Sequence, residues 1–214
     1  MSERQEILGF DLRRSAAAYV ALVRLPNLFT APPDVVLGAA LAVGLGSRVS
    51  PTAVAGLAIA SMLLYAAGTT LNDYFDAVED ATDRPERPIP SKEVSRLEAL
   101  ALGIVLLVGG VAVAFVTAGP FSGAVAGVLA LLVVLYDAVF NGGPIDFLFM
   151  GAARGTNVLL GTTAGLSPLF LPWRTLVVPA VIATYIAGVT YMAERETGGG
   201  DRRVVAVAAT ATAL

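Results

Sequence analysis

The feature that most restricts the fold of this chain is a series of long apolar stretches separated by short charged segments. Residues 53–70, AVAGLAIASMLLYAAGTT, run for 18 residues without a charge, close to the length that an α-helix needs to cross a bilayer. Charged residues make up only 14% of the chain, well below the roughly 25% of an average soluble domain. The sequence therefore predicts an all-α, polytopic transmembrane helix bundle.

Six spans and the beginning of a seventh follow from these stretches. The expected spans cover residues 18–45, 52–71, 97–118, 121–140, 147–170 and 175–192. The first should bend near Pro26 and the Pro32–Pro33 pair. A seventh begins at Val204 and stops at Leu214, too short to cross the bilayer. We therefore expect one membrane-embedded domain over residues 1–214, with C-terminal helices missing.

Lysine and arginine are distributed unevenly between the segments that join these spans. If the spans alternate in direction, eleven basic residues fall on one side: Arg4, Arg13, Arg14, Arg24, Arg84, Arg87, Lys92, Arg96, Arg195, Arg202 and Arg203. Only Arg48 and Arg174 fall on the other side, and Arg154 lies within the fifth span. Because basic loops stay in the cytoplasm, the N-terminus and the loops after the second and sixth spans are expected to be cytoplasmic.

The absence of two residue types restricts the chemistry. The chain has no cysteine and no histidine, which excludes thiolate nucleophiles, Ser–His triads and imidazole metal ligands. A metal ion would have to be held by oxygen ligands, which favours Mg²⁺. No basic surface interleaved with aromatic residues is present, so we expect no nucleic-acid partner.

The densest acidic segment follows the second apolar stretch, with six carboxylates within fourteen positions from Asp73 to Glu86. Asn72, Asp76 and Asp80 are spaced four residues apart and would form one stripe on a helix, with Asp73 beside it. A solvated acidic loop is the simplest interpretation. The helical register and the Asn at the head of the stripe instead favour a Mg²⁺ site that a phosphate ligand completes.

Basic residues follow at once, in DRPERPIPSK. Arg84, Arg87 and Lys92 stand a few residues beyond the carboxylates, and prolines stiffen the connection. Carboxylate-bound Mg²⁺ beside Arg and Lys is an arrangement that binds polyphosphates. Each cation also has a second interpretation, as part of the signal that keeps this loop in the cytoplasm.

NDYFDAVED and RPERPIPS resemble the Asn-x-x-x-Asp-x-x-x-Asp and Arg-Pro-x-x-Ser signature of the UbiA family of intramembrane prenyltransferases. VRLPNLFTAPPDVVLGA, with Arg24 and Asn27, is similar to the first helix of that family, and LYDAVF is similar to the end of its fourth helix. The resemblance implies a helix bundle around a lipid-facing cavity. Two acidic motifs would cap this cavity and bind Mg²⁺ ions together with the diphosphate of an isoprenoid donor.

The resemblance also implies roles for individual residues. The expected metal ligands in the first motif are Asn72, Asp76 and Asp80, with Asp73 as an added candidate. The expected catalytic residues are Asp76, Asp80, Arg24 and Tyr136. The expected diphosphate-binding residues are Arg24, Asn72 and Tyr136 from the resemblance, and Arg87, Lys92 and Arg154 from their charge and position. Two of these have a simpler interpretation, Arg24 as a topology anchor and Tyr136 as an interfacial aromatic residue.

The second acidic motif departs from the family pattern. The matching stretch reads ERETGGGD, in which the expected metal ligands are Glu194, Glu196 and Asp201. The fourth residue after Glu194 is Gly198 and not an acid, so a second metal ion is held differently, for example by Asp201, or is absent. Three successive glycines predict a mobile loop.

Arg154 lies well inside the fifth expected span, where a charge is costly and usually faces a cavity or a partner. It either pairs with an acid or contacts phosphate. Asn157, one turn further on, would lie on the same face. Asp137 and Asp146 could pair with Arg154 or orient the acceptor. The sequence leaves the role of Asp34, in the first span, open.

The function that fits best is Mg²⁺-dependent transfer of a prenyl group from an isoprenoid diphosphate to an aromatic or other polar, small or lipid-like acceptor within the membrane. The alternative is a non-catalytic isoprenoid- or lipid-binding or transport protein on the same scaffold. A CDP-alcohol phosphotransferase is disfavoured, because DYFDAVED lacks the glycine and the Ala-Arg pair of that motif. RPERPIPS and ARGTNVLLG are similar to a divergent bacterial, EboC-like branch, which would place the protein in the bacterial inner membrane.

Overall fold

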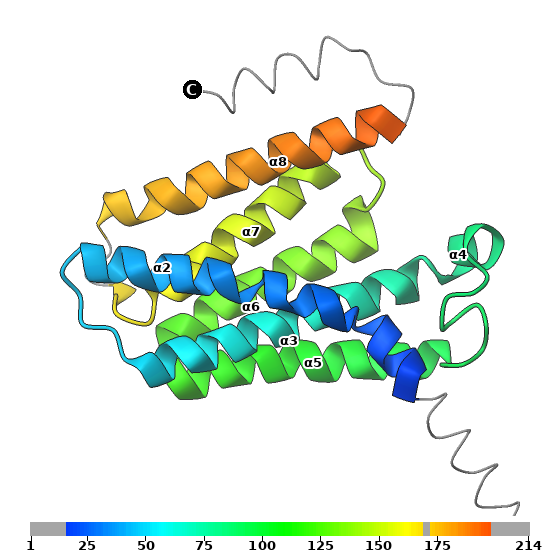
Figure 1. The fold of residues 1–214 in the computed structure, drawn as a ribbon, viewed down its shortest axis with the longest axis horizontal. Coiled ribbons are helices and arrows are strands. Elements are labelled where there is room, and N and C mark those ends of the chain that lie inside the picture. Colours follow the sequence, from blue (N-terminus) through cyan, green and yellow to red (C-terminus); the bar gives the residue numbers. More distant parts are fainter. Residues whose placement is uncertain (1–15, 169–171, 198–214) are drawn as a thin grey trace, which may run out of the picture.

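The computed structural model describes residues 16–168 and 172–197, and for residues 194–197 only the course of the helix. All regular secondary structure in these ranges is helical (Figure 1). A helix over residues 16–22 is followed by η1 (Leu25–Thr30), α2 (Pro32–Gly44), α3 (Pro51–Phe75), α4 (Ala77–Asp83), α5 (Arg96–Ala118), α6 (Pro120–Leu135), η2 (Tyr136–Phe140), α7 (Asp146–Thr162), η4 (Trp173–Leu176) and α8 (Val177–Thr197). The predicted all-α fold is confirmed.

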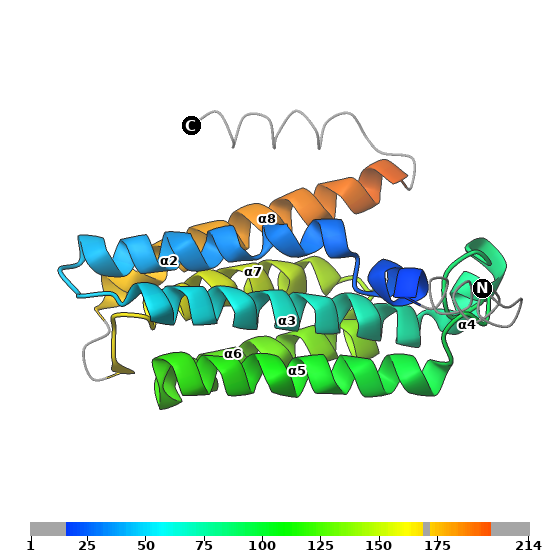
Figure 2. The same ribbon diagram turned by 60° about the horizontal axis from the view of Figure 1, so that its bottom comes forward.

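The long helices form a ring with one helix outside it. α3 packs against α5, α5 against α6, α6 against α7 and α7 against α2, which returns to α3. α8 packs against α7 (Figures 1 and 2). Only 6% of the apolar window of this last helix is buried, so most of α8 faces the surroundings of the bundle.

Five helical segments of the described residues are long and apolar enough to cross a membrane: Ala16–Gly44, Pro51–Phe75, Arg96–Ala118, Pro120–Phe140 and Trp173–Ala193. The other expected span, over 147–170, corresponds to α7, which ends at Thr162 after 17 residues. The hydroxyls of Thr162 and Thr163 donate to carbonyls three residues back, and a glycine and a proline follow, so this helix is shorter than expected. The expected seventh span, from Val204, lies outside the described residues.

The first span is broken where its prolines predict. The chain turns at Arg24, directly before η1, and again before Pro32, the first residue of α2. Arg24 has a left-handed backbone conformation with a φ of 49°, which costs a non-glycine residue about 1–2 kcal/mol. This turn brings the Arg24 side chain to the end of α3.

Two glycines let α2 and α7 approach closely. Gly38 lies against the backbone of Val158 and Gly161, and Gly161 lies against the backbone of Val35. A Cβ atom at either glycine would overlap these atoms. The close contact brings Arg154 of α7 opposite Asp34 of α2.

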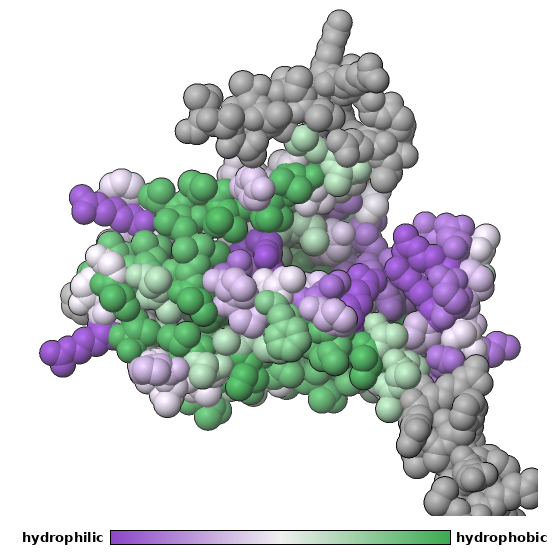
Figure 3. Space-filling view, in the orientation of Figure 1, coloured by the Kyte–Doolittle hydropathy of each residue, from purple (hydrophilic) through white to green (hydrophobic). Residues whose placement is uncertain are grey.

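Hydrophilic side chains gather at one end of the bundle. In Figure 3 they cover the end that carries α4, while apolar side chains cover much of the opposite half. The end of α3, α4 and the C-terminal end of α8 all lie at this end (Figures 1 and 2). The acidic segment after α3 and the C-terminal end of α8 therefore lie on the same side of the bundle.

Candidate functional site

The acidic stripe begins on α3 and continues into α4. α3 ends at Phe75 and α4 begins at Ala77, but backbone hydrogen bonds bridge the junction. The Asp76 N–H donates to the Asn72 carbonyl at 2.9 Å, and the Asp80 N–H donates to the Asp76 carbonyl at 2.9 Å. The four-residue register expected from the sequence is therefore kept.

Two arginines converge on the Asp73 carboxylate. Arg24 Nη2 donates to Asp73 Oδ1 at 2.9 Å and lies 3.4 Å from Asn72 Oδ1. Arg87 Nη1 donates to the same Asp73 oxygen at 3.1 Å and to Asp80 Oδ2 at 2.6 Å. Asp73 and Asp80 are buried, so these charge-assisted bonds offset the cost of removing the carboxylates from water. Arg87 thereby ties the loop after α4 to both acidic helices.

A π-helical turn at the end of α6 faces the stripe. In this turn, η2, the Asn141 N–H donates to the Tyr136 carbonyl, five residues back, at 2.8 Å. Such wide turns occur frequently at functional sites. The Asn141 side-chain amide donates to both Asp76 oxygens, at 2.9 and 3.2 Å. Asp137 in the same turn is only 6% exposed, and its Oδ2 atom has no hydrogen-bond partner in the structure.

Asp76 is surrounded by other acids. Burial, followed by the charges of Asp80 and Glu79, raises the pKa of Asp76, while Arg87 and Asn141 act in the opposite direction. A divalent cation would relieve this repulsion between carboxylates.

Two cavities meet at Asp137. The first, which we call the acidic mouth, has a volume of about 470 Å³ and is lined by Arg84, Asn141 and five carboxylates, those of Asp76, Glu79, Asp80, Asp83 and Asp137. The second, the central cavity, has a volume of about 230 Å³ and is mostly apolar. Its polar lining includes Arg24, Asn72, Tyr136, Asp137 and Arg154. The site thus places concentrated negative charge beside an apolar chamber.

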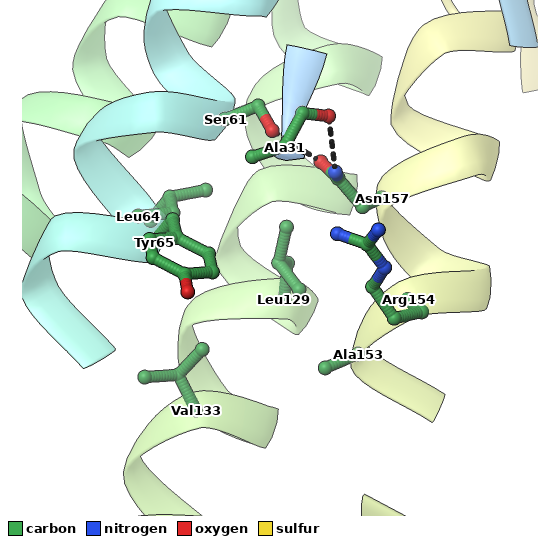
Figure 4. A pocket seen from close by; sticks show the side chains of 9 residues that line it. All are labelled: Ala31, Ser61, Leu64, Tyr65, Leu129, Val133, Ala153, Arg154 and Asn157. Carbon is green, nitrogen blue, oxygen red and sulfur yellow. Dashed lines mark hydrogen bonds between the residues drawn. The ribbon is translucent and has the colours of Figure 1, made fainter. Parts of the chain in front are cut away.

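A third, smaller cavity of about 80 Å³ extends the central cavity into the bundle. The two cavities share the side chains of Leu64, Tyr65, Val133, Ala153 and Arg154. Figure 4 shows Arg154 and Asn157 on α7, across this space from Ser61, Leu64 and Tyr65 of α3.

Ser61, Arg154 and Asn157 of this cavity's wall, together with Asp34 behind them, form what we call the buried polar cluster. Arg154 Nη1 lies 3.1 Å from Asp34 Oδ2 and donates to the Thr30 carbonyl at 3.2 Å. Asn157 Nδ2 donates to Asp34 Oδ2 and to the Ala31 carbonyl, both at 3.0 Å. Asn157 Oδ1 accepts from Ser61 Oγ at 2.7 Å. The acid that pairs with Arg154 is therefore Asp34, and not one of the two considered from the sequence, Asp137 and Asp146.

The remaining predicted site residues are placed less closely together. Tyr136 lines the central cavity with Arg24. Lys92 is exposed in the loop after α4, has a left-handed φ of 63°, and is not among the lining residues of the three cavities described above. Glu194, Glu196 and Asp201 lie outside the residues whose side chains the structure describes.

The sequence interpretation gives Asn141 no role and leaves the role of Asp137 open. The available signal is the stretch YDAVFN, in which the acid and the amide are four residues apart. This spacing would place both on one face of a helix, but the π-helical turn that directs them toward Asp76 has no clear sequence mark.

The donor set of the acidic mouth suits a hard cation. It offers carboxylate and amide oxygens, which Mg²⁺ prefers, and the unpaired Asp137 Oδ2 adds a free acceptor. Among the described residues, no three acidic side chains converge closely enough to hold an ion by themselves. This agrees with the usual mode of Mg²⁺ binding, through one or two carboxylates together with substrate phosphates and water.

These features define a class of protein, a polytopic membrane protein with an oxygen-lined acidic site beside an apolar chamber. Residues 35–209 match the model of the UbiA prenyltransferase family. The chain belongs to this family, which confirms the resemblance seen in its motifs, and it is an integral membrane protein.

The relatives of the chain include proteins named digeranylgeranylglyceryl phosphate synthase. The protein of this name from Methanoregula boonei is 43% identical over 111 residues, which cover 46% of this chain and 39% of the relative. The one from Methanopyrus kandleri is 34% identical over 160 residues, which cover 74% of this chain and 57% of the relative. The chain thus spans between 39% and 57% of the length of these two relatives. Since the relatives include archaeal proteins, they give no support to a bacterial origin.

A solved structure from work on digeranylgeranylglyceryl phosphate synthase in membranes has the same fold. It has a TM-score of 0.74 and 22% sequence identity, and the match covers 88% of this chain and 66% of the other chain. At this identity the similarity shows the fold.

Proposed function

We propose that the protein is a Mg²⁺-dependent prenyltransferase that moves a prenyl group from an isoprenoid diphosphate to a polar, lipid-like acceptor in the membrane. The observation that carries this proposal is that the acidic mouth lies next to the apolar central cavity, with Asp137 in the walls of both. An isoprenoid diphosphate has one strongly anionic end and one apolar end, and the two cavities match these ends once cations are bound at the mouth.

The residues that would hold Mg²⁺ are Asn72, Asp76 and Asp80, with Asp73 beside them. When bound, Mg²⁺ neutralises the negative charge that builds on the departing diphosphate. Arg24 and Tyr136, both in the wall of the central cavity, would donate hydrogen bonds to the same diphosphate. Arg87, held at the stripe, adds positive charge next to it. Two further roles stay predictions from the sequence: diphosphate binding by Lys92, and metal binding by Glu194, Glu196 and Asp201.

The central cavity accommodates the prenyl chain and keeps water away from the reacting carbon. The carbon–oxygen bond to the diphosphate breaks, and the leaving diphosphate keeps the electron pair. A lone pair of the acceptor then forms the new bond to the allylic carbon, and the acceptor releases its proton. Arg154, fixed by Asp34 in the wall of the same cavity, would provide a further positive charge for a phosphate group.

The acceptor class follows from the relatives. Their name describes a product that carries geranylgeranyl chains on glyceryl phosphate. We propose a prenylated glyceryl phosphate as the acceptor and a geranylgeranyl-type diphosphate as the donor, in preference to an aromatic acceptor. The acidic end of the bundle would face the cytoplasm, and labelling a single cysteine in an E86C variant from that side tests this orientation.

A non-catalytic isoprenoid-binding protein is the second candidate function. The second acidic motif favours it, because glycines occupy positions where the family pattern has acids. Such a protein would bind the donor but release no diphosphate.

The two candidates are separated by measuring diphosphate release from geranylgeranyl diphosphate, with Mg²⁺ and with the glyceryl phosphate or an aromatic acceptor, using the full chain in nanodiscs. We expect acceptor-dependent release, reduced roughly 100-fold or more in D76A/D80A. The matched control is E86Q, because Glu86 is an exposed acid of the same segment. Binding without release would favour the second candidate, and a fully active D76A/D80A variant would remove the proposed site.

A further inference from the structure

We infer that Asp137 is a cation ligand, and that a divalent ion binds between the Asp137 carboxylate of η2 and the Asp76 carboxylate of the stripe. This inference rests on the proposed function, because it adds a residue outside both acidic motifs to the same diphosphate site.

The first observation is the state of the Asp137 side chain. It is 6% exposed, and its Oδ2 atom has no hydrogen-bond partner in the structure. A buried carboxylate oxygen without a partner loses its hydration without compensation. A cation coordinated by this oxygen would supply the missing interaction.

The second observation is the position of Asp137 relative to the stripe. Of the charged groups around it, Asp76 acts on it most strongly, followed by Arg24 and Asp73, and the Asn72 side chain also interacts with it. Asp137 and Asp76 both line the acidic mouth. The carboxylates of Asp76 and Asp137, with the Asn72 side chain beside Asp137, form an oxygen-rich donor set that suits a divalent cation.

The third observation is the backbone that carries Asp137. The π-helical turn ends with the Asn141 N–H bonded to the Tyr136 carbonyl, and it brings both Asp137 and the Asn141 side chain to Asp76. The Asn141 amide donates to both oxygens of Asp76. This amide partly compensates the charge of Asp76, whereas Asp137 is left as the open acceptor.

Asp137 also lines the central cavity, next to Arg24 and Tyr136. An ion held by Asp137 would therefore lie at the junction of the two cavities, where the diphosphate meets the prenyl chain. This site would remain available even where the second acidic motif, with its three glycines, supplies fewer ligands than the family pattern.

The test measures binding of Mn²⁺ alone, by electron paramagnetic resonance, to the full chain in nanodiscs. We expect D137N to weaken Mn²⁺ binding roughly tenfold or more, as the loss of groups that support a metal site generally does. The matched control is E86Q, which removes one exposed charge from the same acidic segment but outside the lining of the mouth. It should change the affinity no more than about twofold, because solvent and salt screen an exposed charge.

A second measurement excludes a merely structural role for Asp137. D137N replaces a buried carboxylate whose Oδ2 atom has no partner, so we expect its Tm in EDTA to rise above that of the wild type, and the further rise on adding Mg²⁺ to shrink. A residue needed only for folding would lower Tm under both conditions.

The outcomes separate the two proposals. If D76N loses Mn²⁺ binding while D137N behaves like E86Q, the inference about Asp137 is wrong and the proposed function stands. If the wild type binds no Mn²⁺ in the absence of diphosphate, the inference about Asp137 is wrong, and the proposed function is decided separately by the diphosphate-release assay.

Discussion

The acidic mouth and the buried polar cluster both bring charged side chains together, but they balance these charges differently. In the buried polar cluster, Arg154 faces Asp34 and a backbone carbonyl, and Asn157 uses its amide nitrogen and its oxygen in three hydrogen bonds. In the acidic mouth, five carboxylates share the lining with one arginine, and Asp137 Oδ2 has no partner.

This difference separates a cluster that is complete by itself from one that needs a ligand. The buried polar cluster joins α2, α3 and α7 inside the bundle, where an unpaired charge would be very costly. The acidic mouth keeps an excess of negative charge at the hydrophilic end. Added Mg²⁺ should therefore affect variants of the mouth and leave variants of the cluster unchanged.

The largest effect is expected for R154M. This variant leaves the Asp34 charge without its cationic partner. Because Arg154 is 31% exposed and Asn157 still donates to Asp34, we expect a cost of about 3 kcal/mol, at the lower end for breaking a buried pair. The free energy of unfolding, measured by SDS titration of the reconstituted protein, should fall by this amount with or without Mg²⁺. The double variant D34L/R154M should recover much of the loss, whereas a single variant as stable as the wild type would contradict the account of the cluster.

A smaller, Mg²⁺-sensitive effect is expected for R87M. Arg87 bonds to Asp73 and Asp80. Its loss leaves Asp73 with Arg24 alone and removes the 2.6 Å bond of Asp80, which should cost about 2 kcal/mol in EDTA. Mg²⁺ should restore part of this stability, because the ion can compensate the same carboxylates. The same SDS titration, with and without Mg²⁺, measures the free energy of unfolding of R87M. A loss of stability that Mg²⁺ does not change would mean that the charges of the acidic mouth, like those of the buried polar cluster, need no added ion.

The smallest effect is expected for N141A, which removes the amide that lowers the pKa of Asp76. The pKa of Asp76 should rise further. Because a protonated carboxyl binds Mg²⁺ poorly, the pH below which Mg²⁺ binding is lost should be higher in N141A than in the wild type. E79Q should shift the midpoint in the opposite direction, to lower pH, since it removes a charge that raises the pKa of Asp76. Calorimetric titration with Mg²⁺ over a pH series measures both shifts, and identical midpoints in the two variants would contradict the described surroundings of Asp76.

The sequence predicts the parts of this site that depend on local spacing. Asn72, Asp76 and Asp80 lie in helical register because a four-residue spacing survives the junction of α3 and α4. The apolar stretches predict the all-α fold for a similarly simple reason, the length that a bilayer requires.

Other parts depend on contacts between distant segments and could not be predicted. Arg154 meets Asp34, 120 positions earlier in the chain, because Gly38 and Gly161 allow α2 and α7 to touch. The π-helical turn that brings Asp137 and Asn141 to the mouth leaves the helical period of the apolar residues before it unchanged, so hydropathy alone does not reveal it.

The most direct test of the central claim is the binding of a non-hydrolysable isoprenoid diphosphate analogue with Mg²⁺ and with EDTA. If divalent ions link the acidic mouth to the diphosphate, the wild type should bind the analogue roughly 100-fold more tightly in Mg²⁺. D76A/D80A in Mg²⁺ should then bind as weakly as the wild type in EDTA. Equal affinity of the wild type under both conditions, or an undiminished Mg²⁺ effect in the double variant, would contradict the claim.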